Sequence, residues 1–117
     1  MSDNSLFEMI HLPKVGSAMS LEIRVGAGQS GIITITETSG KVTQYDGDCV
    51  LKYGNFDELN GREIDFNVVC SDVNTSHNNL LVTVEIEGFS TSSPWTLSRQ
   101  VTSGGAYQFF GTLSFFK

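Results

Sequence analysis

IDFNVVC, at residues 64–70, is the stretch of sequence that decides the fold of this chain. Ile64, Phe66, Val68 and Cys70 occupy every second position, so in an extended strand they project from one face. The residues between them are mostly polar, which is typical of a strand that packs one face on a core and leaves the other in water. Such a strand needs others of its kind beside it, and the rest of the chain supplies them.

The same period of two recurs in further segments of the chain. These are residues 21–25, 33–36, 41–45, 49–53, 82–87, 95–101 and 107–116. Clusters of Gly, Asn, Asp and Ser, which favour turns, separate the segments. About seven or eight strands at this spacing predict an all-β fold. We predict an antiparallel β-sandwich with Greek-key-like, immunoglobulin- or C2-like connections.

A small β-barrel is the alternative architecture. Ligand-holding barrels have long, regular hairpins, whereas the strands expected here are uneven, and residues 53–62 suggest a crossover between sheets. Asn55 can cap a single helical turn in that crossover, and Gly61 can end it. The residues expected in the core are Leu21, Ile23, Val25, Ile33, Ile35, Leu51, Ile64, Phe66, Val68, Val82, Val84, Ile86, Leu97, Tyr107, Phe109, Leu113 and Phe115.

The length and charge of the chain restrict its organisation and its partners. We expect residues 1–117 to form one domain, in which residues 1–18 are an arm that docks on the domain or on a neighbouring subunit. Seven Lys and Arg against thirteen Asp and Glu give a net charge of −6, so nucleic acid is not an expected partner. No apolar run is long enough to predict a membrane span. The first residues lack the pattern of a signal peptide, so we expect a cytoplasmic protein as encoded, or a secreted one if a leader has been removed.

Residues 26–31 match the pattern GxGxxG, which in dinucleotide-binding folds holds a pyrophosphate at the N-terminus of a helix. The next residues, 32–36, are rich in β-branched side chains and favour a strand instead. Without a helix, the motif lacks the helix N-terminus that would bind the phosphate. We interpret the motif as a glycine-rich hairpin loop and expect no cofactor.

The acidic turns are the candidate metal ligands. Asp46, Asp48 and Asp72 lie in short turns, and loops at one end of a sandwich can converge on Ca²⁺. Their spacing does not match the EF-hand loop, and turn chemistry explains Asp-Gly and Asp-x-Asn without a metal. We therefore expect no metal site.

Catalytic residues are not evident in the sequence. His11 and His77 are the available imidazole bases, and neither lies in a nucleophile motif. Glu85 and Glu87 share one face of a strand, which a solvent-facing stripe beside the core explains. Cys49 and Cys70 lack a metal or redox spacing. Since no signal peptide is evident we expect buried free thiols, and one disulfide is the alternative in an oxidising compartment. We predict that the protein is not an enzyme.

The C-terminal aromatic residues are the main functional signal. Phe110 and Phe116 lie on the face of residues 107–116 that is opposite to the expected core face. A second copy, a protein partner, a ligand or the N-terminal arm, with Phe7, Met9 and Ile10, could cover them. We therefore predict an interaction or assembly module that self-associates or binds a protein partner through this strand and the arm.

Trp95 supports an alternative function. A Trp at the edge of a loop can stack on a sugar ring, although at the start of a strand it is more often part of the core. The alternative is a carbohydrate- or small-ligand-binding module formed by loops around Trp95, the acidic turns and His77.

Overall fold

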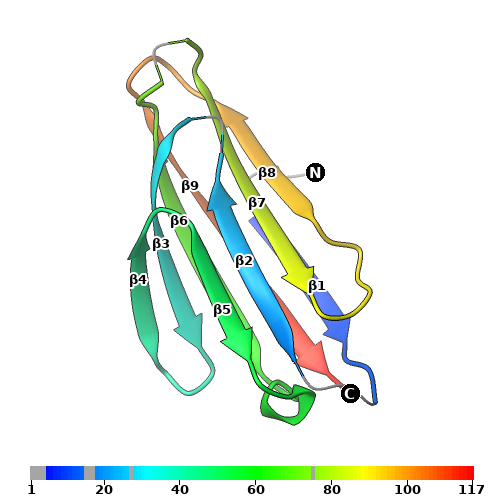
Figure 1. Ribbon diagram of the computed structural model, residues 1–117. Helices are drawn as coiled ribbons and strands as arrows, with labels where there is room; N and C mark the ends of the chain where they lie inside the picture. The colour runs from blue at the N-terminus through cyan, green and yellow to red at the C-terminus, as the bar shows by residue number, and fades with distance from the viewer. Residues whose placement is uncertain (1–4, 15–17, 27, 75) are drawn as a thin grey trace.

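The computed structural model describes residues 5–14, 18–26, 28–74 and 76–117 (Figure 1). The strands that it describes are β1 (Ser5–His11), β2 (Met19–Val25), β3 (Ser30–Glu37), β4 (Val42–Asp46), β5 (Cys49–Tyr53), β6 (Glu63–Ser71), β7 (Asn79–Glu87), β8 (Trp95–Gln100) and β9 (Ala106–Phe116). One sheet has five strands in the order β1-β9-β6-β3-β4, and the other has four in the order β5-β2-β7-β8. The two sheets pack as layers and do not close. The predicted β-sandwich is therefore confirmed, and the barrel alternative is wrong.

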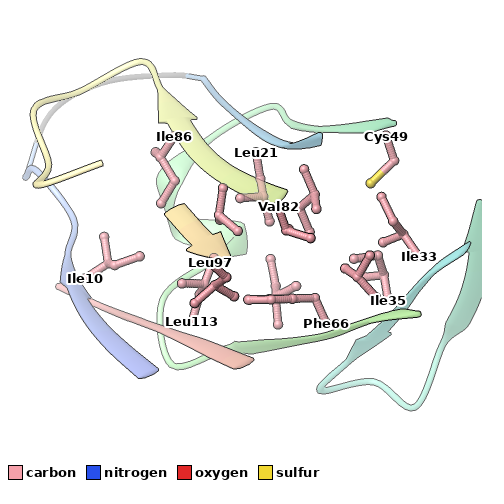
Figure 2. Close-up of a cluster of buried hydrophobic side chains, with 14 of the residues drawn as sticks. Ile10, Leu21, Ile33, Ile35, Cys49, Phe66, Val82, Ile86, Leu97 and Leu113 are labelled. Atoms are coloured by element: carbon pink, nitrogen blue, oxygen red, sulfur yellow. The ribbon is translucent and has the colours of Figure 1, made fainter. Parts of the chain in front are cut away.

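The core lies between the two sheets, where the period of two places it. In β6, at the centre of the five-stranded sheet, Phe66 is 2% exposed and Val68 is fully buried. Figure 2 shows Phe66 and Leu113 from this sheet pointing toward Leu21 and Val82 from the other. All predicted core residues are buried except three, which are half-buried and pack against the core: Val25, Leu51 and Tyr107. Further buried residues lie outside the predicted core: Ile10, Leu12, Met19, Phe56, Leu59 and Leu80. Cys49 and Cys70, expected as buried thiols, are also part of the core.

The N-terminal segment is a strand of the sandwich, which raises the strand count above the predicted seven or eight. β1 runs parallel to β9, with Ser5 opposite Phe110 and His11 opposite Phe116. The other strand pairs are antiparallel, so the prediction of a wholly antiparallel sandwich is wrong at this edge. Residues 5–11, within the predicted arm of residues 1–18, pair with the domain's own sheet. Residues 1–4 and 15–17 of the arm lie outside the described residues.

The connections place distinct groups of loops at the two ends of the sandwich. The loops after β2, β4, β6 and β8 share one end, the upper one in Figure 1, and those after β1, β3, β5 and β7 share the other. β2 ends at Val25 and β3 begins at Ser30 in the other sheet, so the glycine-rich motif lies at a crossover between the sheets and is not the expected hairpin loop. The crossover from β5 to β6 contains the short 3-10 helix η1 (Phe56–Glu58). Asn55 caps it as predicted, accepting a hydrogen bond from the N–H of Glu58 at 3.0 Å.

Among the described residues, no helix has the length and apolar character needed to cross a membrane.

Candidate functional site

Large apolar side chains are exposed together on the outer face of β1 and β9. The exposed fraction is 64% for Phe7, 75% for Met9, 39% for Phe110 and 37% for Phe116. The rings of Phe7 and Phe110 meet edge to face with centroids 6.2 Å apart, and His11 stacks on Phe116 at 5.0 Å. We call these five residues the aromatic strip.

Strand alternation and register assemble the strip from the two ends of the chain. Alternation turns Phe110 and Phe116 away from the core, as the sequence predicted, and the parallel register brings Phe7 and Met9 beside them. The outward positions of β1 and β9 carry no Asp, Glu, Lys or Arg. The strip is thus an uncharged surface on a chain whose net charge is −6.

Ile10 does not belong to this surface. It is 5% exposed and points into the core between the sheets (Figure 2), so its predicted place at the interface is corrected. The reason is parity: Ile10 alternates with Met9 and therefore projects from the opposite face of β1. β1 lies beside β9 rather than over it, and it therefore enlarges the exposed apolar face instead of covering Phe110 and Phe116.

Trp95 lies apart from the acidic turns with which it was grouped. It is the first residue of β8, pairs with Val84, and is half-buried against the core. It also lines a small hollow of about 160 Å³ together with Met9 and Ile10 of β1. The acidic turns are at the end of the sandwich where β8 finishes, so the structure does not bring Trp95 and those turns into one site.

The acidic turns share one end of the sandwich, and the carboxylates of Asp48 and Asp72 bond to the backbone. Asp48 Oδ1 accepts a hydrogen bond from the N–H of Val25 at 2.8 Å. Asp72 is 8% exposed, and its Oδ2 accepts from the N–H of Gly104 at 3.1 Å. The described residues contain no group of three or more His, Cys, Asp or Glu side chains that could hold a metal ion.

His77 and the loop that follows β6 are organised by Gln29, a residue of the glycine-rich motif. Gln29 Oε1 accepts from the N–H groups of Val73 and Asn74 at 2.8 and 2.9 Å, and its Nε2 donates to the carbonyl of Asn79 at 2.9 Å. His77 Nδ1 accepts from the N–H of Asn79 at 3.2 Å. The imidazole also lines a hollow of about 580 Å³ at the end of β7 and β8. The motif thus orders a neighbouring loop.

The carboxylates of β7 form a charged surface cluster. Glu85 Oε1 accepts a hydrogen bond from Arg24 Nη1 at 2.9 Å, and Arg24 also contacts Glu22. These bonds to Glu85 and Glu22 raise the pKa of the Arg24 guanidinium. Glu85 is therefore paired with a cation on β2, an arrangement that the sequence pattern did not reveal.

The two cysteines are free and buried. Burial raises the pKa of the Cys70 thiol to about 11, and burial likewise raises the pKa of Cys49. Both side chains act as small apolar groups of the core. Their raised pKa values oppose formation of the reactive thiolate.

Comparisons with protein-family models, with curated proteins and with solved structures returned no match.

One residue of the aromatic strip, His11, was missing from the predicted interface. The signal that could have found it is the alternation of residues 5–11, where Leu6 and Ile10 project from one face and Phe7, Met9 and His11 from the other. Glu8 interrupts the run of apolar residues. In the strand Glu8 shares the face of Leu6 and Ile10 and leaves the strip uncharged.

Proposed function

We propose that this chain is a non-catalytic interaction module that associates with a second copy of itself through the aromatic strip. The observation that carries the proposal is the joint exposure of Phe7, Met9, Phe110 and Phe116 on neighbouring strands. Scattered apolar residues are ordinary on soluble proteins, whereas contiguous apolar patches mark contact surfaces. Aromatic residues and Met are also the types enriched in such contacts.

Charge favours a second copy as the occupant of the strip. Two chains with a net charge of −6 repel each other, so they approach most easily through a face without carboxylates. The outward positions of β1 and β9 form such a face. An apolar surface of this kind is also self-complementary, as a twofold symmetric dimer requires.

The position of β1 adds a second reason. In its sheet β1 has β9 as its neighbour on one side, and it forms the edge of the sheet on the other. An edge strand presents backbone N–H and C=O groups that can pair with another chain. The strip and this edge are continuous, so one partner can cover both.

Sedimentation equilibrium across a wide range of protein concentration tests the proposal. We expect the wild-type chain to dimerise and the double variant Phe7→Ser, Met9→Ser to be monomeric at the same concentrations, because both side chains are largely exposed and their loss spares the core. Val42→Ser is the matched control. Val42 is 61% exposed on β4, at the other edge of the same sheet.

A wild-type chain that stays monomeric at every concentration overturns the proposal. Equal weakening by Val42→Ser and by the double variant also overturns it, because the contact would then not be specific to the strip.

Carbohydrate binding is the second candidate function. A polar groove beside the aromatic strip favours it, on the outer face of β3, β6 and β9. This location differs from the one expected from sequence, because Trp95 and the acidic turns lie apart in the fold.

A further inference from the structure

The outer face of β9, β6 and β3 contains a groove of about 340 Å³ next to the aromatic strip. Strand register arranges its floor as two rows that run across the three strands. The rows are Thr112, Asp65 and Thr36, and Phe110, Asn67 and Thr34. Since neighbouring strands lie about 4.8 Å apart, each row spans roughly 10 Å. The groove is therefore long enough for a ligand of about two sugar rings.

The chemistry of the groove is polar and without a cation. Its side chains offer hydroxyl, amide and carboxylate groups, and no Lys or Arg lines it. An anionic ligand would meet Asp65 in a chain of net charge −6 and find no cation to offset the repulsion. Hydroxyl groups, in contrast, donate to carboxylate and amide oxygens and accept from amide N–H groups.

The groove floor holds one oriented acceptor for hydroxyl donors, the Asp65 carboxylate. Asp65 Oδ1 accepts a hydrogen bond from Thr112 Oγ1 at 2.7 Å, which orients the carboxylate across the groove floor. Hydrogen bonds from hydroxyls to a carboxylate are short and strong. Asn67 Oδ1 is buried and has no hydrogen-bond partner among the described residues, so the Asp65 carboxylate is the acceptor that a ligand hydroxyl can reach.

An aromatic ring borders the same polar rows. Phe110 lines the groove and is 39% exposed, and its edge-to-face contact with Phe7 restricts the ring. A flat apolar ring beside an oxygen that accepts hydrogen bonds from hydroxyls fits a ligand with C–H groups on one face and hydroxyl groups around its edge. Saccharides have this character. Binding sites in general combine an apolar wall with a few placed polar groups.

We propose that this groove binds a neutral saccharide. Phe110 packs against the C–H face of a sugar ring, Asp65 accepts hydrogen bonds from its hydroxyls, and Asn67 lines the groove floor between them. The threonines of β3 and β9 line the two sides of the groove. Phe110 belongs to both the aromatic strip and the groove, so a dimer contact through the strip would cover the ring, and we expect the saccharide to bind the monomer.

Titration of the ¹⁵N-labelled chain with cellotriose, chitotriose and mannotriose, followed by NMR, tests the proposal. We expect at least one of these probes to shift the amide signals of Thr34, Asp65, Asn67 and Thr112. Asp65→Asn keeps the shape and removes the charge, and we expect it to weaken binding about tenfold or more. Phe110→Leu should weaken binding to a similar degree by removing the flat ring.

Gln44→Ala is the control on the same sheet face, because Gln44 is opposite Thr34 on β4 and does not line the groove. It should leave the Kd unchanged. Met9→Ser separates the two proposals, since Met9 lies in the strip and does not line the groove: this variant should weaken dimerisation and retain saccharide binding. The proposal is overturned if no probe shifts the groove signals at millimolar concentration, or if the shifts centre on Trp95.

Discussion

The ring of Phe66 fills the space that Gly111 leaves by having no side chain. A Cβ placed on Gly111 would be 2.6 Å from Phe66 Cζ and would also collide with the carbonyl oxygen of Leu6. Gly111 is opposite Leu6 on β1 and opposite Phe66 on β6, so β9 meets both neighbours at this residue. The close approach lets a large aromatic side chain pack under the sheet next to the parallel strand β1.

Gly111→Ala should therefore destabilise the protein by about 1–3 kcal/mol, the usual cost of an overpacked core. Urea unfolding measures this as a lower midpoint at an unchanged slope. Gly54→Ala is the control, because its added methyl group would meet only Glu58 Oε1 at 3.4 Å. Equal free energies of unfolding for Gly111→Ala and the wild-type chain would contradict this, because Phe66 and β1 would then make room for the methyl group without loss of stability.

Gln29→Ala should loosen the loop that follows β6. The substitution removes the acceptor for the N–H groups of Val73 and Asn74, and each lost hydrogen bond to a neutral group costs about 0.5–1.5 kcal/mol. Hydrogen exchange at these two amides should accelerate, while exchange in the core strand β6 changes less. Gln44→Ala, on an exposed position of β4, provides the comparison. Unchanged exchange at Val73 would mean that the Gln29 side chain does not order this loop.

Stability should fall between about pH 9 and pH 11 because of Cys70. Its thiol has an ordinary pKa of 9.0 and a pKa of about 11 in the folded chain. Below pH 9 the thiol is protonated in both states, and its contribution to stability is fully present. As the pH rises, the unfolded chain loses the proton first, so about 2–3 kcal/mol is lost by the time the folded pKa is passed.

Cys70→Val isolates this effect, since it keeps an apolar side chain and removes the titrating group. The free energy of unfolding, measured in urea from pH 8 to pH 11, should decline less steeply for the variant than for the wild-type chain. Cys49, whose pKa is also raised by burial, contributes to the decline in both proteins. Parallel pH profiles would contradict the prediction.

Removal of calcium should leave thermal stability unchanged. The carboxylates of Asp48 and Asp72 bond to backbone N–H groups in the acidic turns, and a protein that needed Ca²⁺ there would depend on it for stability. A site saturated a hundredfold above its Kd would add about 2.7 kcal/mol. Calorimetry in millimolar CaCl₂ and in EDTA should therefore give the same Tm, and a higher Tm with calcium would contradict this interpretation.

The local pattern of the sequence was sufficient for the architecture and most of the core. Alternation in segments such as residues 64–70 determines which side chains face inward, because the geometry of a strand allows only two faces. The capped turn at Asn55 and the outward direction of Phe110 and Phe116 followed from equally local rules. Residues 5–11 alternate in the same way, but Glu8 lies among the apolar residues of the inward face and makes the alternation harder to recognise.

Only the tertiary structure decided which strands are neighbours and which surfaces they form. Strand pairing uses backbone hydrogen bonds that almost any residue can make, so a local pattern does not specify that β1 runs parallel to β9. That pairing creates the aromatic strip, and the order β9-β6-β3 brings Asp65, Asn67 and Phe110 into one groove. The tertiary structure also separates Trp95 from the acidic turns, because successive connections alternate between the two ends of the sandwich.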